Sequence, residues 1–225
     1  MLVAISVVAA SYIIGSIPVA YLAGRIVRGV DIRDVGSGNA GASNVWQSVS
    51  KPLVVPVGLA QIGQGLAAVL IAKGAGQSDG VQAAAGIAVI IASDWNPFLR
   101  FAGGRGVGQT IGVLLALAPW ALAAFIIIAL AGVALRAIPQ FVAIALVATP
   151  VLGAISGASP AVIAGCGALG VIAMVKRVLA NSAPAQDCAR PGVWLTRLAY
   201  DRDIRNREAW VRRGLAGDSM RAAKP

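Results

Sequence analysis

The chain has 225 residues, of which 58% are hydrophobic and 12% are charged, and its mean hydropathy is +0.79. This composition excludes an ordinary soluble domain and predicts an integral membrane protein. The net charge is +10, and the sequence contains no histidine, which removes the commonest general base. The two cysteines, Cys166 and Cys188, are not clustered, so they indicate neither a metal site nor a disulfide framework.

Long apolar stretches predict an all-α, polytopic membrane protein with about seven transmembrane helices. They do not alternate with a period of two, which disfavours a β-barrel. The first stretch lacks a basic leader and a clear cleavage site, so we expect a retained span rather than a signal peptide. The stretch 107–135 is either one long helix or two helices separated at Pro119. The predicted spans lie near residues 2–24, 53–72, 81–98, 107–118, 120–135, 138–154 and 159–176.

The charges between these stretches favour seven spans and set their orientation. With the N-terminus outside, the lysines and arginines between the spans fall on the cytoplasmic side, apart from Lys73. Six spans would place Arg136 or the basic C-terminal tail on the wrong side. We therefore expect an external N-terminus and a cytoplasmic C-terminus.

Residues 36–44, after the first span, combine glycines with short polar side chains. Glycines let backbone amides approach a ligand, and serine and asparagine donate hydrogen bonds, so this segment is suited to cradle a phosphate. The alternative is a helix cap with a tight turn, which accounts for one serine or asparagine but not for the whole run. The candidate groups are the side chains of Ser37, Asn39, Ser43 and Asn44 and the amides near Gly36, Gly38 and Gly41.

A second glycine-rich segment, residues 101–106, holds Arg105 inside a run of glycines on the same predicted side of the membrane. A guanidinium in such a turn can bind a phosphate with two hydrogen bonds. The alternative is a positive-inside anchor on a flexible turn. The pairing of the two segments on one side favours a common site.

The tail at residues 181–225 is strongly basic and contains nine of the 19 lysines and arginines. It is either a solvated tail that maintains topology or an interfacial helix on anionic lipid, because its tryptophans and leucines are interspersed with arginines. No motif in it indicates nucleic-acid binding.

Three motifs resemble those of one enzyme family, the bacterial membrane-integral acyl-phosphate:glycerol-3-phosphate acyltransferases of the PlsY type. Segments 15–21 (GSIPVAY) and 37–44 (SGNAGASN) look like the opening of that family. Segment 94–107 (DWNPFLRFAGGRGV) is similar to its second motif, and 175–179 (VKRVL) to the core of its third. The resemblance covers roughly residues 10–180. We therefore expect a transmembrane acyltransferase-like domain at 1–180, followed by the basic cytoplasmic tail.

The resemblance implies seven transmembrane helices in a bacterial cell membrane and a site on the cytoplasmic side. It implies transfer of a fatty acyl group from acyl phosphate to glycerol 3-phosphate or a related acceptor, which gives lysophosphatidic acid without a metal or CoA. Membrane lipid would be a partner and nucleic acid would not, and the sequence names no protein partner. We expect the catalytic residues to be Ser37, Asn39, Asn44 and Arg105. The expected phosphate-binding residues are Ser43, Gly38, Gly41, Gly103, Gly104 and Gly106.

The chain departs from the family pattern mainly where the family carries charged or histidine side chains. Uncharged residues take most of these positions, which leaves two further hypotheses: a different, less charged acceptor, or a catalytically impaired lipid-binding or scaffolding protein. A transporter is disfavoured because the predicted spans contain few polar side chains. The departures are Gln47, Gln61, Gln64, Ala92, Ser93, Ala102, Arg105, Val171 and Met174.

Overall fold

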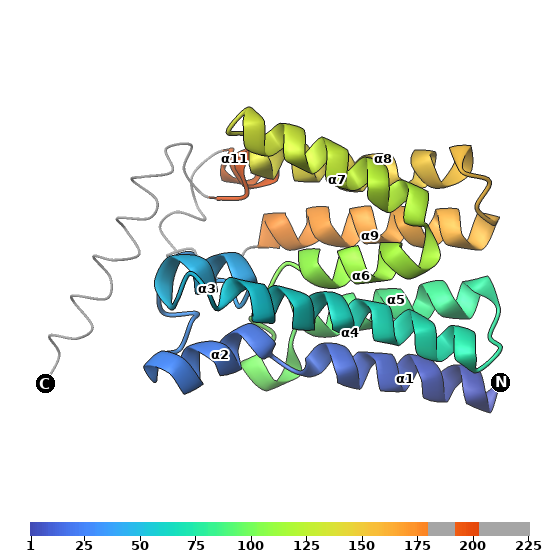
Figure 1. Ribbon diagram of the computed structural model, residues 1–225, viewed down its shortest axis with the longest axis horizontal. Helices are drawn as coiled ribbons and strands as arrows, with labels where there is room; N and C mark the ends of the chain where they lie inside the picture. The colour runs from blue at the N-terminus through green and yellow to red at the C-terminus, as the bar shows by residue number, and fades with distance from the viewer. Residues whose placement is uncertain (180–191, 203–225) are drawn as a thin grey trace, which may run out of the picture.

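The computed structural model describes residues 1–179 and 192–202, and within these ranges all regular secondary structure is helical (Figure 1). The helices run back and forth along the long axis of one bundle. In chain order they are α1 (Leu2–Ser16), α2 (Val19–Arg28), α3 (Ala42–Ser48), α4 (Val54–Gly74), α5 (Asp79–Asp94), the 3-10 turn η1 (Pro97–Leu99), α6 (Val107–Leu117), α7 (Pro119–Ala134), α8 (Ile138–Ile155), α9 (Pro160–Leu179) and α11 (Val193–Tyr200).

Four helical segments of the described chain are long and apolar enough to cross a bilayer. Helices α6 and α7 are apolar but shorter, with 11 and 16 residues, and α5 has 16. The count of seven spans therefore remains a prediction. The four long segments are Leu2–Arg28, Val54–Gly74, Ile138–Ile155 and Pro160–Leu179.

Prolines end or divide three of the apolar stretches. The first is broken between α1 and α2 at Ile17, where the following Pro18 has no N–H to continue the helical ladder. The stretch 107–135 forms two helices, which confirms the break at Pro119. The third span ends at Asp94, four residues earlier than expected, because the chain turns into η1 at Pro97.

Glycines allow the central helices to pack backbone against backbone. A Cβ at Gly65 of α4 would lie 2.0 Å from the carbonyl oxygen of Gln109 in α6. A Cβ at Gly112 of α6 would lie 2.0 Å from the carbonyl oxygen of Ile62 in α4. This contact follows the general use of small residues between membrane helices. The main core beside it includes Val69, Val89, Val113, Leu114, Phe125, Leu146 and Leu169.

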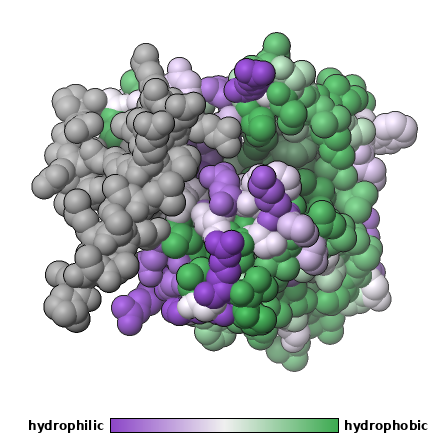
Figure 2. Space-filling model, turned by 60° about the vertical axis from the view of Figure 1, so that its left-hand side comes forward, coloured by the Kyte–Doolittle hydropathy of each residue, from purple (hydrophilic) through white to green (hydrophobic). Residues whose placement is uncertain are grey.

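The loops that carry the candidate site gather at one end of the bundle. The connections from α2 to α4 and from α5 to α6, the C-terminal end of α9, and α11 all lie at the left in Figure 1. Figure 2 shows hydrophilic residues gathered on this end, beside a largely hydrophobic surface. This arrangement places both glycine-rich segments on the same face of the molecule.

Only residues 192–202 of the predicted tail are described. Helix α11 packs against α8 and α9, and it leaves Trp194 and Leu195 about half exposed. Cys188 and most of the tail's arginines lie outside the described residues. The interfacial-helix hypothesis therefore stays a prediction.

Candidate functional site

Asn44 organises the first glycine-rich loop. Its side chain is fully buried, and its Nδ2 donates to the carbonyl oxygens of Ile32 at 2.8 Å, Val35 at 3.0 Å and Asn39 at 3.0 Å. Its Oδ1 accepts from the Ser37 backbone N–H at 3.1 Å. Because these contacts occupy the whole carboxamide, Asn44 holds the loop in shape.

Arg105 joins the second glycine-rich loop to the first through Asn39. The hydrogen-bond network orients the Asn39 amide so that its oxygen faces the guanidinium. This oxygen then accepts from Nη2 at 3.1 Å and from Nη1 at 3.2 Å. Asn39 is buried, and its backbone N–H donates to the hydroxyl of Ser37 at 3.5 Å. Ser37, Asn39 and Arg105 thus form one cluster.

A second link between the loops starts at Arg33. Its guanidinium donates to the carbonyl oxygen of Leu99, in η1, at 2.8 Å. The same side chain forms an ion pair with Asp31, with Nη2 2.7 Å from Oδ2. The hydrogen bonds from Arg33 hold the pKa of the Asp31 carboxyl below its ordinary value. This ion pair fixes the arginine that ties the first loop to the second.

The backbone of the second loop lies directly on the C-terminal end of α5. The N–H of Gly103 donates to the carbonyl oxygen of Asp94 at 3.2 Å, and that of Gly104 donates to Ser93 at 3.1 Å. A Cβ at Gly103 would lie 2.0 Å from the Ser93 carbonyl oxygen, so only glycine permits this approach. The loop is therefore built by close backbone packing.

The tail supplies an acidic partner for Arg105. Nη1 of Arg105 forms an ion pair with Asp201, and Nη2 donates to the Asp201 backbone oxygen at 3.0 Å. The side chain of Asp201 is 17% exposed, and Arg177 of α9 lies 3.8 Å from its other carboxylate oxygen. Burial raises the pKa of the Asp201 carboxyl, and the two arginines act in the opposite direction. The sequence offered no signal for this contact, which joins residues 96 positions apart.

A buried acidic residue and a buried basic residue lie behind the second loop. Asp94 is fully buried, and its carboxyl oxygens have no hydrogen-bond partner among the described residues. Lys176 is also buried, donates to the Asp94 backbone carbonyl, and lies with its ammonium 5.2 Å from the centre of the Trp95 ring. Two ionisable side chains are thus withdrawn from solvent beneath the loop that carries Arg105.

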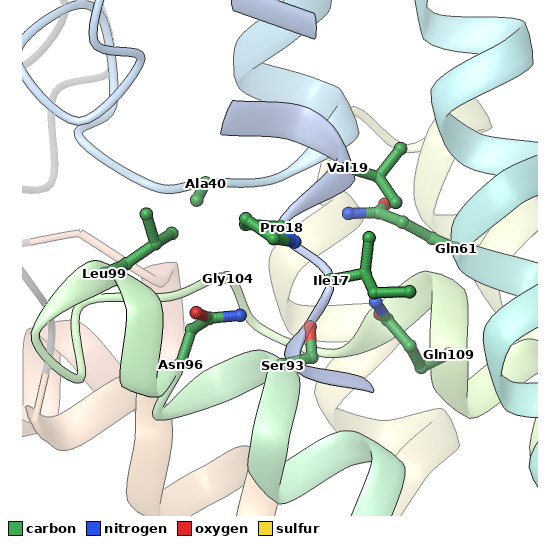
Figure 3. Close-up of a pocket in the computed structure, with 10 residues that line it drawn as sticks. All are labelled: Ile17, Pro18, Val19, Ala40, Gln61, Ser93, Asn96, Leu99, Gly104 and Gln109. Carbon is green, nitrogen blue, oxygen red and sulfur yellow. The ribbon is translucent and has the colours of Figure 1, made fainter. Parts of the chain in front are cut away.

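A pocket opens beside these loops, at the break between α1 and α2 (Figure 3). It contains about 220 Å³ of space, part of it open to solvent. All of its polar side chains are uncharged. It is lined by Ile17, Pro18, Val19, Ala40, Gln61, Ser93, Asn96, Leu99, Gly104 and Gln109.

The structure brings some predicted site residues together and separates others. Ser43 is exposed on α3, and no contact in the described residues joins it to the cluster around Arg105. The N–H of Gly38 donates to the Val35 carbonyl at 3.1 Å, as those of Gly103 and Gly104 donate to α5. These three amides are therefore occupied within the loops. The N–H groups of Gly41 and Gly106 have no hydrogen-bond partner among the described residues, and a phosphate-binding role for them stays a prediction.

Several polar groups were absent from the predicted site. Gln61, Gln64 and Ser93 were recognisable only as departures from a family pattern, and Gln109 had no signal. Gln64 accepts a hydrogen bond from Gln109 at 3.0 Å and donates to the carbonyl oxygens of Ile14 and Ile17 at 2.7 and 3.0 Å. It therefore links α1, α4 and α6 next to the pocket.

Residues 5–182 match the sequence model of a family described as glycerol-3-phosphate acyltransferase. A relative from Dehalococcoides mccartyi strain CBDB1, glycerol-3-phosphate acyltransferase 4, is 34% identical over 92% of each chain. A glycerol-3-phosphate acyltransferase from Parasynechococcus marenigrum strain WH8102 is 38% identical over 72% of this chain and 76% of its own.

Solved structures of an integral membrane glycerol 3-phosphate acyltransferase, PlsY, share the fold. The glycerol 3-phosphate form aligns with a TM-score of 0.70 and 27% identity, covering 77% of this chain and 88% of its own. The lysophosphatidic acid form aligns with the same TM-score and 25% identity, covering 77% of this chain and 87% of its own. The likeness supports an all-helical, multi-pass membrane protein.

Proposed function

Because this chain belongs to the glycerol-3-phosphate acyltransferase family, we propose that its two glycine-rich loops hold the phosphate of an acyl-phosphate donor. The chain is a membrane acyltransferase that transfers a fatty acyl group to glycerol 3-phosphate in phospholipid synthesis. The proposal therefore concerns the donor and the residues that act on it. The observation that carries it is the contact between Asn39 and Arg105, which makes one polar cluster from the two loops.

The reaction needs positioning more than acid–base machinery, because an acyl phosphate is already activated. The primary hydroxyl oxygen of glycerol 3-phosphate forms a bond to the acyl carbonyl carbon. The bond between that carbon and the phosphate oxygen breaks, and phosphate leaves with the electron pair. The hydroxyl proton passes to a phosphate oxygen, so the step balances without histidine, which the sequence lacks.

In this proposal Ser37 and Asn39 donate hydrogen bonds to the donor phosphate, and Arg105 supplies the positive charge. A charge-assisted hydrogen bond from a guanidinium strengthens as negative charge develops on the leaving phosphate. Asn44 acts indirectly, because its carboxamide is fully used in shaping the loop. Asp201 now occupies both terminal nitrogens of Arg105, so it must exchange with the incoming phosphate.

The test is turnover by purified protein in lipid, with palmitoyl phosphate and radiolabelled glycerol 3-phosphate. We expect lysophosphatidic acid from the wild type and a loss of roughly 10- to 150-fold in kcat/KM for Arg105→Ala, because one charged hydrogen-bonding group is removed. Arg105→Lys should recover part of this loss by keeping the charge. Lys51→Ala is the control, since Lys51 is an exposed cation near Trp46, away from the cluster. Folded wild type that releases no phosphate with any acceptor would instead favour a non-catalytic lipid-binding protein.

We also propose that the loop-bearing end of the bundle faces the cytoplasm. The connections at this end carry most of the basic residues, whereas Lys73 is in the last turn of α4, and α4 ends at the opposite end of the bundle (Figure 1). Cytoplasmic loops carry an excess of Lys and Arg. In a Cys188→Ser background, a cysteine at Ser78 should react with an impermeant reagent on intact cells. A cysteine at Lys51 should react only after permeabilisation. The reverse pattern would overturn this orientation.

A further inference from the structure

The turn between α5 and the second glycine-rich loop exposes two phenylalanines and an arginine. Phe98 of η1 is 73% exposed and Phe101 is 61% exposed. Arg100 lies between them in the sequence and is also exposed. A group of exposed, large apolar side chains usually marks a contact with lipid or with another protein. We call Phe98, Arg100 and Phe101 the Phe-Arg turn, and its exposed rings indicate that it has a binding partner.

The backbone of this turn is held in a conformation that its own residues disfavour. Arg100 and Phe101 have positive φ angles of 53° and 63°, in the left-handed region that a bulky residue rarely occupies. Two hydrogen bonds fix the turn: the N–H of Phe101 donates to the carbonyl oxygen of Asn96 at 2.8 Å, and that of Ala102 donates to Leu99 at 3.1 Å. Glycine would adopt this backbone without strain. Strain of this kind is concentrated at functional positions, so the exposed arginine and phenylalanine favour a role in binding.

The Phe-Arg turn lies where the lipid-facing surface of α1 ends. Asn96, just before η1, donates to the carbonyl oxygen of Ser16, the last residue of α1, at 2.8 Å. Helix α1 belongs to the apolar segment Leu2–Arg28, which is long enough to cross a bilayer. Near the end of α1, Ile13 is 67% exposed, and Ile17 just beyond it is 49% exposed. The two phenylalanines therefore continue an apolar surface that faces lipid, at the end of the bundle where the polar loops gather (Figure 1).

The arginine of the turn has no acidic partner within the described chain. Asp31, on the first loop, already forms ion pairs with Arg33 at 2.7 Å and with Arg25 at 3.7 Å. Arg33 also donates to the carbonyl oxygen of Leu99, so this ion-paired group lies against the turn. Arg100 forms no ion pair and no side-chain hydrogen bond with any described residue. An exposed cation beside aromatic side chains at a membrane surface is suited to the phosphate of an anionic lipid.

We propose that the Phe-Arg turn binds the headgroup of an anionic phospholipid of the surrounding bilayer. The two phenylalanines enter the boundary between headgroups and acyl chains, and the guanidinium of Arg100 binds the lipid phosphate. This lipid is a resident of the bilayer and takes no part in acyl transfer. Because the turn leads directly into residues 103–106, the bound lipid lies next to the loop that carries Arg105.

The test places a fluorescent reporter in the turn of the full-length chain. In a Cys188→Ser background, Phe98→Cys is labelled with nitrobenzoxadiazole, whose ring replaces that of the phenylalanine, and the remaining Cys166 is only 1% exposed. The protein is reconstituted into vesicles of phosphatidylcholine and phosphatidylglycerol. In parallel samples a quenching spin label is attached to one lipid or to the other, close to the headgroup. We expect both lipids to quench, and phosphatidylglycerol to quench more strongly, because one arginine enriches an anionic lipid roughly five-fold beside it.

Three variants of the labelled protein separate charge from insertion. Arg100→Gln should abolish the preference for phosphatidylglycerol, and Arg100→Lys should retain it. Phe101→Asn should weaken quenching by both lipids, because asparagine tolerates the positive φ but lacks the ring. Arg136→Gln is the matched control and should keep the preference. It removes another exposed arginine with a positive φ, at the turn between α7 and α8, on the opposite side of the bundle from α1 (Figure 1).

Three results would overturn the proposal. Equal quenching by the two lipids in the otherwise unchanged protein would show that the turn does not select an anionic headgroup. A preference that survives in Arg100→Gln would show that another cation provides it. Quenching by neither lipid would place the turn in water and would favour a protein partner for the exposed rings.

Discussion

Gln64 stabilises the break between α1 and α2 with its hydrogen bonds, and Gln64→Met should lower the stability of the protein. Pro18 has no N–H, so the carbonyl oxygen of Ile14 lacks its usual helical partner four residues on. Gln64 Nε2 supplies a replacement at 2.7 Å and also donates to Ile17 at 3.0 Å. Its oxygen accepts from Gln109 at 3.0 Å. Methionine fills a similar volume but can make none of these bonds.

The substitution should destabilise the protein by about 1–3 kcal/mol, because it leaves the Gln109 amide nitrogen without a partner in a buried setting. The Ile14 carbonyl keeps a hydrogen bond from the Ile17 N–H at 3.3 Å, and the Ile17 carbonyl keeps one from the Val19 N–H at 3.0 Å, so we add nothing for them. At roughly 2–4 °C per kcal/mol for a chain of this size, the unfolding temperature should fall by roughly 2–12 °C.

The assay is the temperature at which detergent-purified protein loses its monodisperse peak. Gln82→Met is the control, because it removes one hydrogen bond, to Gln77, in a turn at the far end of the bundle. A Gln64→Met protein that unfolds within about 1 kcal/mol of the wild type would refute the reasoning.

Three shorter predictions concern the loops. Gly103→Ala should abolish turnover, because its Cβ would meet the Ser93 carbonyl oxygen at 2.0 Å, whereas the control Gly63→Ala in α4, with nothing within 4 Å, should leave kcat/KM within about twofold of the wild type. Asp201→Asn should lower the KM for palmitoyl phosphate several-fold by loosening the competing ion pair, and an increased KM would show that Asp201 positions the arginine instead. The lowered pKa of Asp31 means that its contribution to stability is complete above its unfolded pKa of about 4 and is lost as the pH falls through the folded value. The unfolding temperature of Asp31→Asn should therefore fall less than that of the wild type between pH 6 and pH 3.

The sequence predicted the helices well because long apolar stretches and prolines act locally. It located the break at Pro119, but it missed the break at Pro18, because hydropathy stays high across that site. It also singled out Asn44, although it did not indicate that the carboxamide of this side chain would be fully used in hydrogen bonds within the loop. These local features follow from residue type and spacing.

The remainder of the site depends on contacts between residues that are distant in sequence. Gln109 lies 45 residues from Gln64, and Arg105 lies 96 residues from Asp201. No periodicity or motif encodes such a pairing, since it is set by how the helices pack. The uncharged pocket shows the same limit, because Gln61 and Ser93 were recognisable only as departures from the family pattern and Gln109 had no signal until the fold placed the three side chains together.

The short helix α6 has a consequence for the lipid around the protein. Its 11 residues rise roughly 16 Å, about half the thickness of a bilayer's hydrocarbon core, and the 16 residues of α7 rise roughly 24 Å. A bilayer meets such a mismatch by thinning beside the short elements. Trp120, Ile127 and Leu130 of α7 are exposed, whereas Leu115 is the only exposed residue of α6, so α7 is the short helix that meets the lipid. We therefore expect the bilayer to be thinner there. The turnover rate of the enzyme should then depend on the acyl-chain length of the surrounding lipids.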